Sequence, residues 1–157
     1  MASRDLQVGD KAPSFTLPTD GDAKVSLSEL KGKSVVLYFY PKDDTPGCTA
    51  EAIAFSKDSK AFKAAGAVVI GVSKDSPASH DKFKAKYDLA LTLAADEATK
   101  TAEAYGVWVE KSMYGRRYMG MERATFLIDA KGVIRQIWRK VKVSGHAPEV
   151  LAAVKAL

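Results

Sequence analysis

The segment YPKDDTPGCTAEA, residues 40–52, contains the only cysteine of the chain, Cys48. The preceding Thr45-Pro46-Gly47 has turn chemistry, and helix-forming residues follow. The first turn of a helix has unpaired backbone N–H groups, which together with the helix dipole favour a negative charge. A thiolate at such a position is a nucleophile, whereas a free cysteine is more commonly a small buried apolar residue. The local sequence favours the reactive thiol.

The cysteine count excludes two classes of site. One cysteine cannot form an intramolecular disulfide, and it cannot build a zinc site on several thiolates. The two histidines, His80 and His146, have no metal-ligand spacing, and we expect both at the surface or capping a helix. No zinc-knuckle, Walker or dinucleotide-binding glycine pattern occurs. The sequence therefore contains no recognisable metal-binding or nucleotide-binding motif.

Length and composition predict one domain over residues 1–157. The chain has a mass of 16.9 kDa, 46% hydrophobic and 27% charged residues, and no repeat or long linker. Its apolar runs, such as residues 34–40, are too short to span a bilayer. The N-terminal segment MASRDLQVGDKAP has no apolar core of the signal-peptide kind. We therefore expect a cytoplasmic protein with no membrane partner.

The net charge of +5 raises the question of an anionic partner. The lysines are spread along the chain among Asp and Glu, and the densest basic segments are Lys111–Arg117 and Arg135–Lys142. This pattern favours a solvated surface over a nucleic-acid site.

Strand and helix patterns alternate along the chain. A continuous apolar run at 34–40 predicts a central strand covered on both faces, which brings Cys48 to the carboxyl edge of the sheet. We expect further strands at 15–17, 24–26, 68–72, 91–94, 123–129 and 133–138, and helices at 48–65, 76–87, 97–105 and 146–157. The first two of these strands form an N-terminal hairpin, and the order predicts an α/β fold: a central mixed β-sheet with helices on both faces.

The sequence around Cys48 resembles the active site of a known family. FYPKDDTPGCTAEA resembles the Pro-x-x-x-Thr-x-x-Cys motif of peroxiredoxins, with Pro41, Thr45 and Cys48 at the matching positions. Nearly the whole chain is similar to the peroxiredoxin Q branch, also called bacterioferritin comigratory protein, through VGDKAPSFTLPTDG and YGVWVEKSMYGRRYMGMERATFLIDAKG. Arg123 falls where this family has its active-site arginine. The resemblance implies a thioredoxin-like fold.

The resemblance also implies a role for each matched residue. Cys48 is the peroxidatic nucleophile, which reduces hydrogen peroxide and organic hydroperoxides through a sulfenic acid. Thr45 orients sulfur and peroxide through its hydroxyl, Arg123 stabilises the thiolate and the leaving oxygen, and Pro41 shields the pocket. The backbone N–H groups of Gly47 and Cys48 complete the peroxide-binding site. No metal, haem, flavin or other cofactor is required.

The tyrosines before Cys48, the two tryptophans and Glu51 are expected to have structural roles. We expect Tyr38 and Tyr40 in the core and the pocket wall, and Trp108 and Trp138 in packing contacts. Glu51, one turn into the helix, is expected to support the arginine or the loop.

The chain departs from the common family pattern in lacking a resolving cysteine. Ile53 stands five residues after Cys48, and Lys84 stands in the next predicted helix, at the two places where other members carry that thiol. We predict a one-cysteine cycle in which thioredoxin, or glutathione with glutaredoxin, supplies the reducing thiol. The sulfenic acid is then open to a second peroxide and to sulfinic acid formation. A monomer is expected.

Three alternatives come from other classes. A non-catalytic thioredoxin-like binding or chaperone protein would function without Cys48. A nucleic-acid binder would use Lys111–Arg117 and show steep salt dependence. A thiol-disulfide oxidoreductase is disfavoured because it ordinarily uses a Cys-x-x-Cys pair.

Overall fold

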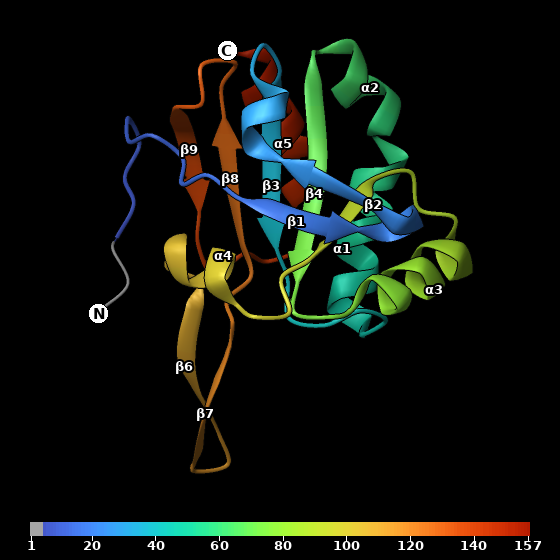
Figure 1. Cartoon of the computed structure of the whole chain (residues 1–157), viewed down its shortest axis with the longest axis vertical. Helices are drawn as coiled ribbons and strands as arrows, with labels where there is room; N and C mark the ends of the chain where they lie inside the picture. The colour runs from blue at the N-terminus through green and yellow to red at the C-terminus, as the bar shows by residue number, and fades with distance from the viewer. Residues whose placement is uncertain (1–4) are drawn as a thin grey trace.

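A seven-stranded mixed sheet forms the centre of the structure (Figure 1). The computed structural model describes residues 5–157, so residues 1–4 of the predicted domain and of the N-terminal segment lie outside it. The strand order is β2-β1-β5-β4-β3-β8-β9, with β3, β4 and β5 parallel and the remaining pairs antiparallel. In residues 5–157, no helix is both long and apolar enough to cross a membrane.

The elements follow the predicted order, with one hairpin added. The sheet contains β1 (Thr16–Thr19), β2 (Ala23–Ser26), β3 (Ser34–Phe39), β4 (Ala67–Ser73), β5 (Thr92–Ala95), β8 (Ala124–Ile128) and β9 (Ile134–Trp138). The helices are α1 (Pro46–Lys57), α2 (Ser59–Ala64), α3 (Pro77–Tyr87), α4 (Lys100–Ala104) and α5 (His146–Lys155), with 3₁₀ turns η1 (Asp20–Asp22) and η2 (Leu27–Leu30). The added hairpin consists of β6 (Trp108–Met113) and β7 (Arg116–Met121).

Strand β3 is buried because its side chains alternate between two apolar clusters. Val35, Leu37 and Phe39 belong to one cluster, while Val36 and Tyr38 belong to the other. Strands β4 and β8 pair along its two edges. With both faces and both edges covered, β3 is the central strand that its unbroken apolar sequence predicts.

Helices cover both faces of the sheet, as expected. On one face α1, α2 and α5 contact one another and contribute Phe55, Phe62 and Val150 to one cluster. On the other face Ala102 of α4 and the adjacent Tyr105 join the other cluster. The N-terminal hairpin is also present, and β1 pairs with β5 so that the hairpin extends the sheet (Figure 1).

The predicted helix 48–65 is two helices, which corrects the prediction. Helix α1 begins earlier, with Pro46 in its first turn and Thr45 at the N-cap, and it ends at Lys57. Asp58 leaves helical geometry at φ −94° and ψ 11°, and α2 begins at the next residue. Asp and Ser side chains compete with helical hydrogen bonding, so the pair Asp58-Ser59 is a weak point in the helical pattern.

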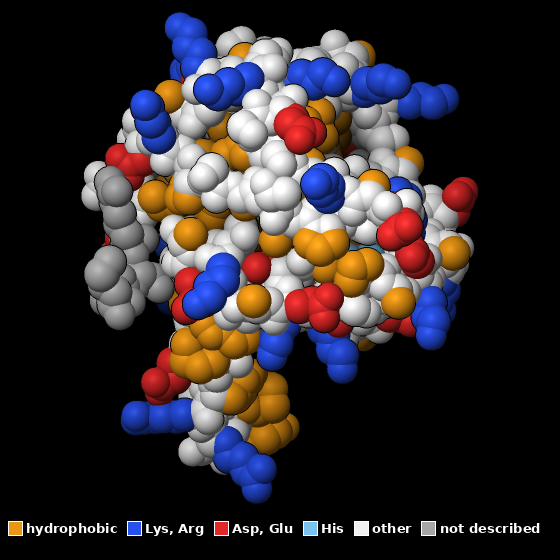
Figure 2. Space-filling view, in the orientation of Figure 1, with side chains coloured by type: hydrophobic (Ala, Val, Ile, Leu, Met, Phe, Trp, Pro, Cys, Tyr) orange, Lys and Arg blue, Asp and Glu red, His pale blue; other side chains and the backbone are white. Residues whose placement is uncertain are grey.

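The hairpin of β6 and β7 was not predicted. It projects from the body of the molecule (Figure 1), and its turn residues Tyr114 and Gly115 both have positive φ, 52° and 77°. Large apolar side chains lie exposed along it and gather at this end of the surface (Figure 2); they are Met113, Tyr114, Tyr118 and Met119. The predicted basic segment Lys111–Arg117 is the tip of this hairpin.

The close approach of Tyr38 to Gly71 yields a stability prediction. The two residues face each other across β3 and β4, and a Cβ atom on Gly71 would lie 2.7 Å from Tyr38 Cζ and Oη. We expect Gly71→Ala to lower the free energy of unfolding by about 1–3 kcal/mol, because the buried Tyr38 ring is stacked on Phe55 and has no room to move. Chemical denaturation measures this change.

Gly120→Ala is the matched control for that substitution. A Cβ there would meet Lys111 Cδ at 3.1 Å, part of a flexible side chain that can shift. A loss of stability at Gly120 as large as at Gly71 would contradict the explanation.

Candidate active site

The N-terminus of α1 positions Cys48. Strand β3 leads into the loop at 40–45, and α1 then starts at Pro46 near the end of the sheet from which the β6–β7 hairpin projects (Figure 1). Cys48 is the third residue of α1 and only 2% exposed, and it belongs to the apolar cluster beneath the helix. Cys48 therefore belongs to the first turn of a helix, where backbone N–H groups lack intrahelical partners, as the sequence predicts.

Arg123 reaches this sulfur from the other side. It stands between β7 and β8, and its Nη2 donates to Cys48 Sγ at 3.5 Å. A Cβ on Gly47 would lie 3.0 Å from the same Nη2, so glycine at this position leaves space for the guanidinium. Burial disfavours the charge of Arg123, but Glu51 and Cys48 outweigh burial and raise its pKa. The structure thus brings together Gly47, Cys48 and Arg123.

Glu51 is the second partner of the guanidinium. Arg123 Nη1 donates to Glu51 Oε1 at 2.8 Å, so one arginine joins the carboxylate and the sulfur. Glu51 is 1% exposed, and burial raises its pKa to about 7 although Arg123 acts in the opposite direction. The predicted support of Arg123 by Glu51 is present in the structure.

Two polar atoms near the sulfur are buried without a hydrogen bond. Within residues 5–157, these atoms are Glu51 Oε2 and Tyr38 Oη. Burial raises the pKa of Tyr38 well above its ordinary value, and the charges of Glu51 and Cys48 add to this effect. Tyr38 is therefore a neutral core residue that lies close to the site, as expected.

Thr45 and Pro41 lie on the loop that precedes the helix. The Thr45 hydroxyl donates to the Lys42 carbonyl at 2.8 Å, which closes the turn before α1. Pro41 is exposed at the surface of this loop. The roles in peroxide binding given to Thr45, Pro41 and the backbone N–H groups of Gly47 and Cys48 remain predictions.

Lys111 near the site was missed as a candidate from the sequence. It lies on β6, and its Nζ donates to the Met121 carbonyl at 2.5 Å at the base of the hairpin. Burial lowers the pKa of Lys111, as does the positive charge of Arg123, while the Cys48 sulfur acts in the opposite direction. The basic run contained this residue, but only the hairpin fold brings it toward Cys48.

Both histidines contradict the expectation of a surface position. His80 is 0% and His146 is 6% exposed. His146 Nε2 lies 2.8 Å from Thr125 Oγ1, and its ring stands edge-on to Trp138. His80 faces Asp43 and Ala94. Each finds its polar partner in another element, which allows a histidine to be buried.

The remaining predicted positions are also located. Tyr40 is buried in the same cluster as Cys48, and Trp108 and Trp138 pack against the clusters as expected. Ile53 is 44% exposed on α1, and Lys84 on α3 pairs with Asp20. In the part of the chain that the structure describes, no group of three or more His, Cys, Asp or Glu could hold a metal ion.

Comparison with known proteins decides the family. Residues 8–137 match the model of the AhpC/TSA family. Peroxiredoxin Bcp of Bacillus subtilis is 49% identical over 150 residues, which cover 96% of each chain. The chain belongs to the peroxiredoxin family. This confirms the resemblance and the thiol-peroxidase class that it implied.

Solved structures confirm the fold of this peroxiredoxin. Peroxiredoxin Q of Xanthomonas campestris is similar with a TM-score of 0.87 at 46% identity, covering 90% of each chain. PrxQ of Xylella fastidiosa is similar with a TM-score of 0.92 at 39% identity, covering 98% of each chain. The predicted thioredoxin-like mixed sheet and the similarity to the peroxiredoxin Q branch are both confirmed.

The burial of Glu51 predicts a stability change with pH. Its pKa is raised from 4.5 to about 7 in the folded state, so the folded state binds more protons between these values. The stabilisation is fully present below pH 4.5 and is lost as the pH rises through 7. Relative to Glu51→Gln, the free energy of unfolding should fall by about 3 kcal/mol over this interval.

Urea denaturation between pH 4 and 8 measures this difference. Exposed Glu29→Gln is the control for removing one carboxylate. A constant difference between this peroxiredoxin and Glu51→Gln at all pH values would contradict the assignment.

Proposed function

We propose that this peroxiredoxin reduces hydrogen peroxide and organic hydroperoxides with Cys48 as the nucleophile and Arg123 as its electrostatic partner. The observation that carries the proposal is the 3.5 Å contact between Arg123 Nη2 and Cys48 Sγ at the start of α1. The same guanidinium is held by Glu51 at 2.8 Å, which orients it toward the sulfur. The bacterioferritin comigratory protein of Xanthomonas campestris, 46% identical, has alkyl peroxide reduction activity, which supports the organic substrates.

The first half of the cycle oxidises the sulfur by two electrons. The Cys48 thiolate attacks one peroxide oxygen, the S–O bond forms and the O–O bond breaks. The second oxygen leaves as hydroxide or alkoxide and takes up a proton to become water or an alcohol. Arg123 lies where it stabilises negative charge on the sulfur and on the leaving oxygen.

The loop and the first helical turn complete the proposed site. Backbone N–H groups of Gly47 and Cys48 bind the peroxide oxygens, because a first helical turn has free donors. The Thr45 hydroxyl donates to Lys42 and keeps its lone pairs for a peroxide proton. Pro41 limits the access of water from the loop side.

An external thiol completes the cycle. The chain has no second cysteine, so a thiol from outside condenses with the sulfenic acid, releases water and forms a mixed disulfide. A second thiol then releases Cys48. Thioredoxin, or glutathione with glutaredoxin, fits this requirement, and a cytoplasm keeps such thiols reduced. The single-domain monomer and the cytoplasmic location stay predictions.

Removing the guanidinium tests the electrostatic role. Arg123→Met should lower the second-order rate constant for Cys48 oxidation by hydrogen peroxide about 10²–10³-fold, because a charge partner of the reacting atoms is lost. Dimedone trapping with quenched-flow sampling measures this rate constant. Arg117→Met removes an exposed arginine paired with Glu110 on the neighbouring hairpin and should leave the rate unchanged.

Loss of turnover in Cys48→Ser excludes the alternative of a binding protein that functions without this thiol. Equal rates for Arg123→Met and Arg117→Met would refute the role of Arg123.

Resolution by an external thiol predicts a detectable intermediate. After one equivalent of hydrogen peroxide, addition of glutathione should give one Cys48–glutathione mixed disulfide, observed as an intact-mass increase and absent in Cys48→Ser. Excess peroxide without a thiol should give sulfinic acid instead. Failure to trap the glutathione adduct during turnover would exclude glutathione and leave a protein thiol as the reductant.

A further inference from the structure

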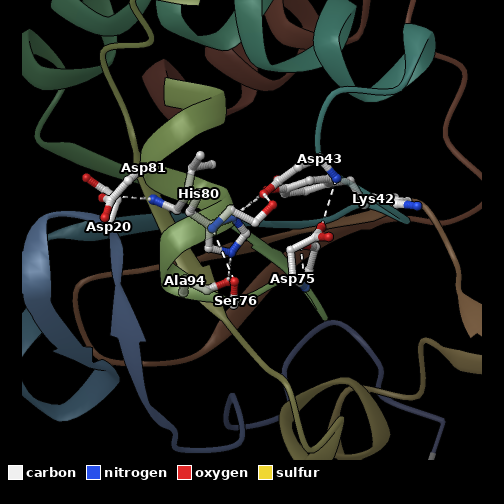
Figure 3. A network of polar contacts seen from close by, with 12 residues as sticks. Asp20, Lys42, Asp43, Asp75, Ser76, His80, Asp81 and Ala94 are labelled. Carbon is white, nitrogen blue, oxygen red and sulfur yellow. Dashed lines mark hydrogen bonds and ion pairs between the residues drawn. The ribbon is translucent and has the colours of Figure 1, made fainter. Parts of the chain in front are cut away.

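A buried ion pair ties the active-site loop to α3, away from the reacting sulfur. Asp43 lies in the loop two residues from both Pro41 and Thr45, and His80 lies on α3. The two side chains are nearly inaccessible, with 4% and 0% exposure, and Asp43 Oδ2 lies 2.7 Å from His80 Nδ1 (Figure 3). Burying two charged groups has a large desolvation penalty, so this ion pair is weak evidence for stability alone. Its position beside the active-site loop suggests a functional role.

The hydrogen bonds around His80 fit a protonated imidazole beside a carboxylate. Its Nε2 lies 2.9 Å from the Ala94 carbonyl, which can only accept, so Nε2 is protonated. Asp43 accepts from Tyr40 Oη at 2.5 Å and from Ser79 Oγ at 2.8 Å, as expected for a carboxylate. Nδ1 then donates to this carboxylate, and both ring nitrogens carry hydrogen.

The groups that face His80 come from several elements. Asp43 faces it from the loop, Tyr40 Oη at the end of β3 lies 3.4 Å from Nδ1, and Asp75 after β4 adds a negative charge. Burial lowers the pKa of His80, but the hydrogen bond and charge of Asp43 together with Asp75 outweigh burial and raise it. Deprotonation therefore requires a pH above the ordinary range of histidine, and it removes the charge that attracts Asp43.

The loop is attached to this cluster at its backbone as well. The Asp43 N–H donates to Asp75 Oδ2 at 2.8 Å (Figure 3). Ser73 Oγ donates to the same oxygen at 2.6 Å. The neighbouring Asp44 makes a second contact with α3, through Lys86 Nζ and Tyr87 Oη, each at 2.7 Å. This second contact is exposed and solvent-screened, so it contributes little to holding the loop.

We propose that His80 and Asp43 are positioning residues of the peroxide-reducing site, which hold the loop of Pro41 and Thr45 in place through a buried ion pair. This inference rests on the proposed roles of Pro41, Thr45 and Cys48. Neither His80 nor Asp43 touches the sulfur; they act on where the Thr45 hydroxyl lies. A displacement of about 1 Å in a reacting geometry can cost about 10²-fold in rate.

Comparing two reagents separates loop geometry from thiolate reactivity. Hydrogen peroxide requires the oriented site, whereas iodoacetamide requires only an accessible thiolate. The ratio of their rate constants with Cys48 therefore cancels the thiolate fraction at each pH. We expect this ratio to fall by about tenfold or more as the pH rises through the titration of His80, with the same midpoint. Two-dimensional ¹H–¹⁵N spectra of the imidazole measure that titration.

Three variants complete the experiment. His80→Gln should lower the ratio by about tenfold at pH 7 and remove the change in the ratio at the His80 midpoint, and Asp43→Asn should do the same while keeping a group that can hydrogen-bond. Lys86→Met removes the exposed ion pair between α3 and Asp44 of the same loop and should leave the ratio unchanged. If His80→Gln does not fold, the positioning role is still tested by Asp43→Asn and by the pH dependence of the ratio in the unmodified protein.

The outcomes distinguish this inference from the proposed function. If the unmodified protein reacts with peroxide no faster than free cysteine does, the proposed function fails. If it reacts rapidly but the ratio is flat across the His80 titration, or unchanged in the folded variants, only the positioning role is refuted.

Discussion

The contact between the Arg123 guanidinium and the Cys48 sulfur is the interaction around which the rest of the structure is arranged. The two residues are 75 positions apart, so only the tertiary fold can bring them together. Strand β8, which starts directly after Arg123, pairs with β3, and β3 leads through the loop to α1 and Cys48. Gly47 leaves the space that the guanidinium fills.

The polar groups that surround Arg123 and Cys48 lower the stability of the folded protein, because they are buried and only partly hydrogen-bonded. Glu51 holds the guanidinium, but it is a buried carboxyl group with one oxygen unpartnered, and the nearby Tyr38 hydroxyl is also unpartnered. Buried polar atoms without partners are rare in folded proteins and are expected to concentrate at functional sites. The apolar clusters on both faces of β3 supply the compensating burial.

Features determined by residues close together in the sequence could be predicted, whereas features that depend on distant residues could not. The apolar run of β3 is a local signal, and it was interpreted correctly. The helix that carries Cys48 was also expected, but Pro46 and Gly47 were assigned to the preceding turn, whereas they are the first two residues of α1. The β6–β7 hairpin has exposed side chains along most of its length and a turn at Tyr114-Gly115 without the usual Asn or Asp, so neither burial pattern nor turn type indicated it. His80 was assigned to the surface because its partner Asp43 is 37 residues away in the sequence.

The most direct test of the account is the reaction of the reduced protein with one equivalent of hydrogen peroxide, followed by intact mass and dimedone trapping. The account predicts a single sulfenic acid at Cys48, formed much faster than on free cysteine, because Arg123 and the first turn of α1 stabilise the charges that the reaction requires. Oxidation of Cys48 at the rate of free cysteine would contradict it and would mean that the 3.5 Å contact has no catalytic role.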